Sequence, residues 1–215
     1  MSATKTTNSP AAIVLCGGKS LRMGTDKALV RLGGETLLQR CCRLISKSAD
    51  PVVVVSSPSQ VLPELAQRIL VTEDHLPGEG PLTGLLAGLR QIRRRVPFGD
   101  FPIWVGSCDA PFVNVGVINA MVWKLGEFDA VAVRHRGRIN PHSAVYRLSV
   151  IETVERVVMS GERRATAILD HLSLKTVEST VLHEIDPDLA FLCNLNTAED
   201  LERARARLGK ESSGP

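Results

Sequence analysis

The sequence predicts an α/β fold with a doubly wound, mostly parallel sheet flanked by helices. One observation is that short β-branched runs alternate with segments whose apolar residues recur at helical spacing. A second is that two of these runs end in a glycine-rich or carboxylate-bearing loop. Such loops are typical of the carboxyl ends of parallel strands, where α/β sheets bind their ligands.

The first half of the chain carries the clearest alternation of strands and helices. Buried strands are predicted over residues 11–15, 51–56, 69–72, 103–105 and 129–133. Helices with one apolar stripe are predicted between them, over residues 36–47, 82–95 and 114–125, the last with an N-cap at its start. This order is that of a Rossmann-like sheet.

After residue 134 the rhythm changes, although no linker or internal repeat interrupts the chain. We expect strands over 142–146 and 174–181, helical pieces over 149–160 and 165–171, a short apolar segment over 191–195, and a helix over 197–208. Thr197 and Asp200 fit a capping box at the start of that last helix. We therefore predict one domain over residues 11–208, with an N-terminal tail at 1–10 and a C-terminal tail at 209–215.

Composition excludes several classes of function. Hydrophobic residues make up 44% of the chain and charged residues 23%, as in soluble globular domains. The net charge of +3 and the absence of aromatic residues interleaved with the basic run at 93–95 predict no nucleic-acid partner. No apolar run approaches the ~20 residues of a membrane span. The first ten residues also lack the apolar core of a signal peptide, so we expect a cytoplasmic protein.

The five cysteines form neither a disulfide framework nor a zinc motif, because their number is odd and none occurs as C-x-x-C. We expect most of them to be small buried apolar residues. Cys108 is adjacent to Asp109, which leaves a nucleophilic role as an alternative. A buried thiol at a strand end is the favoured interpretation.

The loop over residues 15–27 (LCGGKSLRMGTDK) follows the first predicted strand and has the composition of a phosphate-binding loop. Its glycines let backbone N–H groups approach an anion closely, while Arg22 and Lys27 supply positive charge. Its spacing fits neither the P-loop nor the dinucleotide fingerprint. The alternative is a purely structural turn with solvated cations.

Asp109 lies just after the strand at 103–105, at the carboxyl end where ligands bind. A carboxylate there is the hard oxygen ligand that Mg²⁺ prefers, and the alternative is an N-cap for the following helix. Asp26 either braces the loop or pairs with Lys27. A phosphate-binding loop and a metal-type carboxylate together predict an enzyme that acts on a nucleotide.

An ordered set of motifs over residues 11–205 resembles the molybdenum cofactor nucleotidyltransferases, which have the nucleotide-diphospho-sugar transferase-like fold. The motifs are the 15–27 loop, Glu73-Asp74, Gly80-Pro81-Leu82-Thr83-Gly84, Cys108-Asp109-Ala110-Pro111, Gly161-Glu162-Arg163-Arg164 and Asn194-Leu195-Asn196-Thr197. The guanylyl-transferring members are the most similar.

The resemblance implies transfer of GMP from GTP to the phosphate of molybdenum-molybdopterin, with Mg²⁺ as cofactor and pyrophosphate as the second product. It also implies contacts with cofactor-donor and molybdoenzyme chaperone proteins. Alternatives are cytidylyl transfer, transfer to a cobinamide phosphate or sugar phosphate, and a non-catalytic nucleotide-binding module.

By this resemblance, Arg22, Lys27 and Asp109 are the catalytic residues, and Asp109 is also the metal ligand. The same three residues bind the nucleotide together with Leu15, Cys16, Gly17, Gly18, Ser56 and Asp74. Gly18 accompanies guanine selection in the family, since a missing Cβ leaves room for a purine. Ser56 and Cys16 are departures, because the family often carries asparagine and alanine at these positions.

The resemblance assigns Arg163, Asn194 and Asn196 to the acceptor side, with residues 140–142 in a related loop. Turn and helix-cap chemistry is the alternative for the two asparagines, and a helix-to-helix connection is the alternative for Arg163. The acceptor phosphate is already anionic near neutral pH, so no strong general base is required. We accordingly expect His75 and His142 to be hydrogen-bonding surface residues, with a contribution to the reaction as the alternative.

Overall fold

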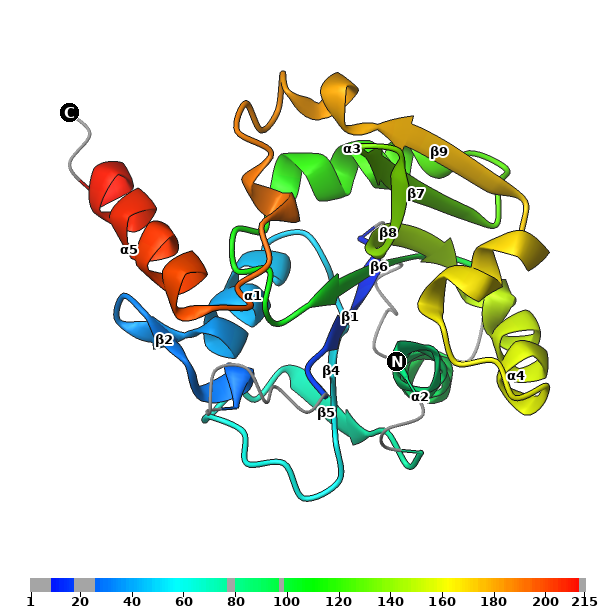
Figure 1. Cartoon of the computed structure of the whole chain (residues 1–215). Coiled ribbons are helices and arrows are strands. Elements are labelled where there is room, and N and C mark those ends of the chain that lie inside the picture. The colour runs from blue at the N-terminus through cyan, green and yellow to red at the C-terminus, as the bar shows by residue number, and fades with distance from the viewer. Residues whose placement is uncertain (1–8, 18–25, 77–79, 97–98, 213–215) are drawn as a thin grey trace, which may run out of the picture.

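A computed structural model describes residues 9–17, 26–76, 80–96 and 99–212. Its centre is a seven-stranded sheet in the order β5-β4-β1-β6-β8-β7-β9 (Figure 1). All strands run in one direction except β8, which is antiparallel to both β6 and β7. The strands are β1 (Ala11–Leu15), β4 (Val52–Ser56), β5 (Ile69–Glu73), β6 (Pro102–Ser107), β7 (Ala130–His135), β8 (Arg138–Arg147) and β9 (Leu174–Glu178). The predicted fold class is confirmed.

Helices cover both faces of the sheet, because side chains alternate between faces along each buried strand. On β1, Ala12 and Val14 pack into the cluster that contains α1 and α3, whereas Ile13 and Leu15 pack into the cluster that contains α2 and α4. Figure 1 shows α2 and α4 together on one side of the sheet. These helices are α1 (Leu37–Ile45), α2 (Pro81–Arg95), α3 (Val115–Leu125) and α4 (Ile151–Met159).

A small third cluster joins the C-terminal helix to the first half of the chain. Helix α5 (Ala198–Ser212) contributes Ala204, which is buried with Leu32 and Phe112. Leu32 belongs to a two-stranded sheet of β2 (Arg31–Leu32) and β3 (Glu35–Thr36), which the sequence did not predict because each strand is only two residues long. This packing holds the segment before α5 beside the carboxyl end of β6.

Several boundaries differ from the prediction. Strand β8 is longer than the predicted 142–146 because it pairs along both edges. The strand predicted over 174–181 ends at Glu178, and a 3-10 helix (Ser179–Leu182) follows. Helix α5 continues past the predicted end at residue 208. Pro10, which we placed in the N-terminal tail, is buried, and its carbonyl accepts a hydrogen bond from Asp50 N at 2.9 Å.

The topology places the candidate residues at one edge of the sheet. The chain winds from β1 through β4 to β5 on one side and then returns to β6 on the other side of β1. The loops that follow these strands therefore leave a common edge, with a switch point between β1 and β6. Among the helices of the described ranges, none has the length and apolar character needed to cross a bilayer.

We predict that G88A destabilises the protein, because a Cβ at Gly88 on α2 would lie 2.8 Å from both Cδ1 and Cγ2 of Ile13 on β1. Overpacking of this kind costs about 1–3 kcal/mol, which exceeds the helix propensity gained from alanine. Urea unfolding measures the change. G209A is the control, since its Cβ would meet nothing within 4 Å, and it should leave stability unchanged or slightly raised. Equal stability of G88A and the natural chain would contradict this packing.

Candidate active site

A lysine, a carboxylate and an amide from three distant segments meet at the carboxyl edge of the sheet. Lys27 begins a 3-10 helix (Lys27–Leu29), Asp109 follows β6, and Asn196 precedes α5. The Lys27 Nζ atom donates to Asp109 Oδ2 and to Asn196 Oδ1, each at 2.6 Å. Only 16% of the Lys27 side chain and 15% of the Asp109 side chain are exposed, so bulk water screens this ion pair weakly.

The Asp109 carboxylate is fixed from several directions. Ser107 Oγ donates to Asp109 Oδ1 at 2.7 Å, and the Asp109 carbonyl accepts from Leu195 N at 2.8 Å. Helix α3 is capped instead by Asn114, whose Oδ1 accepts from Gly116 N and Val117 N. The N-cap alternative for Asp109 is therefore wrong, and the carboxylate is directed toward Lys27.

The loop after β1 begins with a close approach to the neighbouring strand. The backbone N–H groups of Cys16 and Gly17 both donate to the carbonyl of Val55, at 2.8 and 3.2 Å. A Cβ on Gly17 would lie 2.8 Å from Ser57 Oγ and 3.1 Å from Ser57 N, so this position favours glycine. Gly18 and Arg22, both assigned to the nucleotide, lie outside the described residues.

Asp26 braces the end of this loop and does not pair with Lys27. Its carboxylate accepts from Ala28 N at 2.9 Å and from Gln60 Nε2 at 2.8 Å. The same Gln60 nitrogen donates to the carbonyl of Cys16 at 3.2 Å. Gln60 thus ties the start of the loop to its end. The sequence did not indicate Gln60, since a single glutamine in an unpatterned stretch carries no signal.

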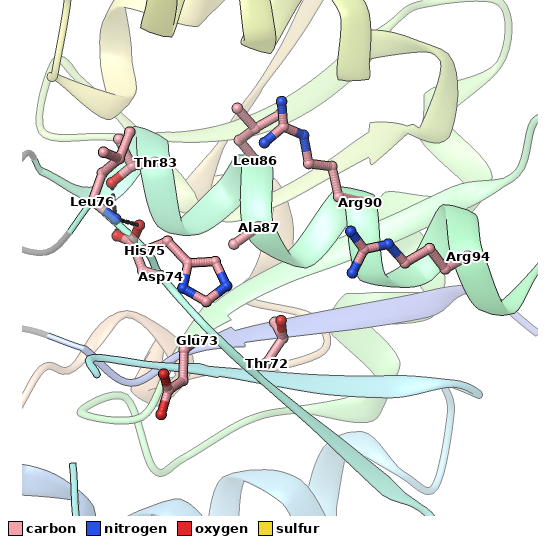
Figure 2. A pocket seen from close by; sticks show the side chains of 10 residues that line it. All are labelled: Thr72, Glu73, Asp74, His75, Leu76, Thr83, Leu86, Ala87, Arg90 and Arg94. Atoms are coloured by element: carbon pink, nitrogen blue, oxygen red, sulfur yellow. Dashed lines mark hydrogen bonds between the residues drawn. The ribbon is translucent and has the colours of Figure 1, made fainter. Parts of the chain in front are cut away.

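Ser56 and Asp74 lie together where β4 and β5 end. Ser56 is buried, and its carbonyl accepts from Asp74 N at 2.8 Å. The Asp74 carboxylate accepts from Thr83 Oγ1 at 2.7 Å and from Leu76 N at 3.0 Å. Figure 2 shows these contacts beside the first turn of α2. Asp74 thereby joins the end of β5 to the start of α2.

A pocket of about 110 Å³ lies beside Asp74, between β5 and α2 (Figure 2). Its polar lining includes His75 at the strand end and Arg90 and Arg94 along the helix. Arg90 also pairs with Glu155 of α4.

The backbone of Arg163 lies near the start of α2. Gly80 has a φ of +96°, and a Cβ there would lie 2.5 Å from the Arg163 carbonyl oxygen. The Arg163 guanidinium donates to the carbonyl of Val158 at 2.9 Å. Residues 161–164 connect α4 to a 3-10 helix (Ala165–His171), as the alternative interpretation for this motif expected.

The two C-terminal asparagines differ in their surroundings. Asn196 contacts Lys27, whereas Asn194 is exposed and makes no hydrogen bond to Lys27 or Asp109. The capping box of α5 is confirmed, since Asp200 N donates to Thr197 Oγ1 and Thr197 N donates to Asp200 Oδ2. Asp200 Oδ2 also accepts from Asn196 N at 3.0 Å, so the helix cap fixes the backbone that presents Asn196 to Lys27.

Cys108 is a core thiol and not a nucleophile. Its hydrogen bond with Cys16, burial and the nearby charge of Asp109 raise the pKa of Cys108 well above its usual range. The side chain is therefore protonated at neutral pH, and only the thiolate is a strong nucleophile. Cys16, Cys41 and Cys42 are also buried, as the sequence predicted for most of the cysteines, and Cys193 is exposed.

Comparison with known proteins gives a consistent family. The profile of the MobA-like NTP transferase domain matches residues 12–177. A probable molybdenum cofactor guanylyltransferase of Mycobacterium avium (strain 104) is 33% identical over 92% of this chain and 96% of its own length. The molybdenum cofactor guanylyltransferase of Desulfosudis oleivorans is 29% identical, covering 91% of this chain and 94% of its own length.

Solved structures agree with this result. The molybdopterin-guanine dinucleotide biosynthesis protein A of Archaeoglobus fulgidus superposes with a TM-score of 0.75 at 27% identity, covering 93% of this chain and 99% of its own. The 2-C-methyl-D-erythritol 4-phosphate cytidylyltransferase of Thermus thermophilus has a TM-score of 0.67 at 14% identity, covering 94% and 99%. The second likeness shows a shared nucleotidyltransferase-type fold only.

We predict that the contribution of Asp200 to stability depends on pH. Hydrogen bonds from Asn196 N, the Thr197 hydroxyl and Arg203 lower the pKa of Asp200 to about 2, below its value of about 3.9 in an unfolded chain. The stabilisation is complete above pH ~4 and is lost as the pH falls toward 2. D200N should therefore lower the free energy of unfolding at pH 7, and this effect should shrink between pH 4 and 2.

Urea unfolding at several pH values measures this dependence. E199Q is the matched control, because Glu199 is an exposed partner of the same Arg203 and belongs to no cap. Equal destabilisation by D200N at pH 7 and at pH 2.5 would contradict the prediction.

Proposed function

Because this chain belongs to the MobA-like NTP transferase family, we propose that it transfers GMP from GTP to the phosphate of molybdenum-molybdopterin. The observation that carries the proposal is the cluster of Lys27, Asp109 and Asn196 at the switch point of the sheet. It combines a cation for the triphosphate with a carboxylate for a metal. Lys27 follows β1 and Asp109 follows the adjacent strand β6, so the cluster lies at the switch point of the sheet.

The reaction joins an oxygen of the acceptor phosphate to the α-phosphorus of GTP and breaks the bond between the α- and β-phosphates. Pyrophosphate leaves with the electron pair of that bond. The attacking phosphate is already anionic, so the protein needs chiefly to position and neutralise charge. Lys27 supplies a point charge to the triphosphate, and the backbone N–H groups of the loop after β1 supply further donors.

The residues at the cluster fit a magnesium ion that arrives with the nucleotide. Mg²⁺ is usually held by one or two carboxylates, with phosphate oxygens and water completing its shell. Asp109 provides one such carboxylate, and Ser107 orients it. When bound, Mg²⁺ would neutralise charge on the reacting phosphates. Within the described ranges, no group of three or more His, Cys, Asp or Glu residues that could hold a metal ion is found.

We assign the nucleobase to the region between Ser56, Asp74 and the start of α2. Asp74 is held there by Thr83, and the turn at Gly80 packs against the Arg163 backbone. Leu15, Cys16 and Gly17 line the adjacent strand end. Gly18 and Arg22 complete this assignment on the similarity of the loop to the family, with Arg163, Asn194 and Asn196 on the acceptor side.

We predict that the protein forms a labelled dinucleotide and pyrophosphate when incubated with labelled GTP, Mg²⁺ and molybdenum-loaded molybdopterin. GTP should be preferred over CTP, and molybdopterin over cobinamide phosphate or a sugar phosphate in a competition assay. Preference for CTP would overturn the guanine assignment. Binding of GTP without turnover, with every acceptor tested, would instead favour a non-catalytic nucleotide-binding module.

We predict that D109N lowers kcat by at least ~100-fold, as expected for loss of a group that stabilises charge in the transition state. The variant should remain folded, because asparagine keeps the shape of the side chain. Its amide oxygen can accept from Lys27, and its NH₂ group can donate to Ser107 Oγ. Circular dichroism and steady-state kinetics measure the two effects. D188N is the control, since Asp188 is a surface partner of Arg207. Full activity of D109N would remove the assigned metal role.

A further inference from the structure

Strand β8 is irregular directly beside the active-site edge. Its pairing with β7 passes from Ala132 opposite Ala144 to Val133 opposite Asn140, so residues 141–143 have no partners on β7. Its pairing with β6 ends where Ala144 lies opposite Val105. The unpaired residues therefore lie beside the part of β6 that continues toward Asp109. Such bulges re-aim side chains and are over-represented next to active sites.

This bulge is fixed by its own hydrogen bonds. Asn140 Oδ1 accepts from His142 N at 3.0 Å, and Asn140 Nδ2 donates to Ser143 Oγ at 3.3 Å. The hydroxyl of Tyr146, a fully buried side chain, donates to the carbonyl of Pro141 at 3.1 Å. The conformation of residues 140–143 is thus determined by neighbours other than the His142 imidazole.

The His142 imidazole is largely buried, and among the described residues its Nε2 atom has no hydrogen-bond partner. The expectation of a surface histidine is wrong. Burial lowers the pKa of His142, and the negative charge of Asp109 partly opposes this effect. A buried polar atom without a partner costs folding free energy, and such atoms are rare enough in native proteins to need an explanation. A leucine could fill this position without that cost.

The position of His142 relative to the nucleotide-binding loops indicates which substrate could provide a hydrogen-bond partner for its imidazole. The nucleotide-binding loops follow β1, β4 and β5, and Asp109 follows β6. Strand β8 lies on the far side of β6 from those loops. A group that reaches both the α-phosphate near Asp109 and the His142 ring must therefore belong to the acceptor. In the proposed reaction, the reacting end of the acceptor is a phosphomonoester.

We infer that His142 is a substrate-positioning residue whose Nε2–H donates a hydrogen bond to an oxygen of the acceptor phosphate. This inference rests on the proposed function. A neutral imidazole suits the task, because it orients the phosphate without neutralising the oxygen that attacks. Phosphate oxygens accept hydrogen bonds only, so the inference also assigns the ring proton to Nε2 in the complex.

The kinetic test compares H142L and H142Q. Leucine removes the donor, whereas the glutamine amide places an NH₂ group near the position of Nε2. We expect H142L to lower kcat/KM for molybdenum-molybdopterin about tenfold or more, which is the effect of losing a hydrogen bond to a charged group. The KM for GTP should change less than about twofold. H142Q should recover most of the loss. The melting temperature of H142L should equal or exceed that of the natural chain, because an unpartnered buried polar atom is removed.

H171L is the matched control, since His171 is exposed at the end of the 3-10 helix after α4 and should show natural kinetics. Natural kinetics for H142L would overturn the inference. A lower melting temperature together with equal losses toward both substrates would also overturn it, since those losses indicate a structural role. If H142L kept its activity but lost stability, and H142Q restored that stability, the partner of Nε2 would be a buried water. This result would also overturn the inference.

A binding measurement separates failure of this inference from failure of the proposed function. The ¹⁵N resonances of His142 are recorded in the natural protein during titration with inorganic phosphate and with molybdopterin, each in the presence of GTP and Mg²⁺. A selective change at Nε2 supports the phosphate contact, even if the protein proves to transfer a different nucleotide. An unchanged Nε2 resonance in a protein that carries out guanylyl transfer overturns the contact while the function stands.

Discussion

The ion pair between Lys27 and Asp109 is the interaction on which the active-site edge depends. The two residues are far apart in the chain and are held by different strands of the sheet, yet their charged atoms lie 2.6 Å apart in a partly shielded position. Neither charge is well placed to exist alone there, because removing one partner would leave the other without compensation. Each residue therefore compensates the charge of the other until a substrate supplies an opposite charge.

In the proposed reaction, this arrangement would link binding to catalysis through exchange of partners. A triphosphate would offer oxygen atoms to Lys27, and its accompanying metal would offer a positive charge to Asp109. Asn196 and Ser107 hold the two groups in place during such an exchange, since each is anchored separately from the ion pair. The C-terminal helix contributes through the Asp200 cap, which explains why a segment remote from the nucleotide loops has to pack against β2.

Sequence patterns predicted the parts of this structure that local chemistry determines. Strands β1, β4, β5, β6 and β7 and the helices between them follow from periodicity, and the caps at Asn114 and Thr197 follow from short polar residues at helix starts. The role of Asp26 remained open between two alternatives, because only the tertiary structure shows whether Gln60 or Lys27 is within reach. The burial of His142 could not be predicted, since it depends on an irregular pairing between β7 and β8 that leaves no trace in the alternation of residues.

The most direct test of this exchange of partners is a crystal structure of the protein with GTP and Mg²⁺, compared with that of the free protein at the same pH. We predict that Lys27 Nζ leaves Asp109 and lies within hydrogen-bond distance of a phosphate oxygen, while Asp109 ligates the metal. An intact Lys27–Asp109 pair, with the triphosphate and metal bound elsewhere, would contradict this prediction.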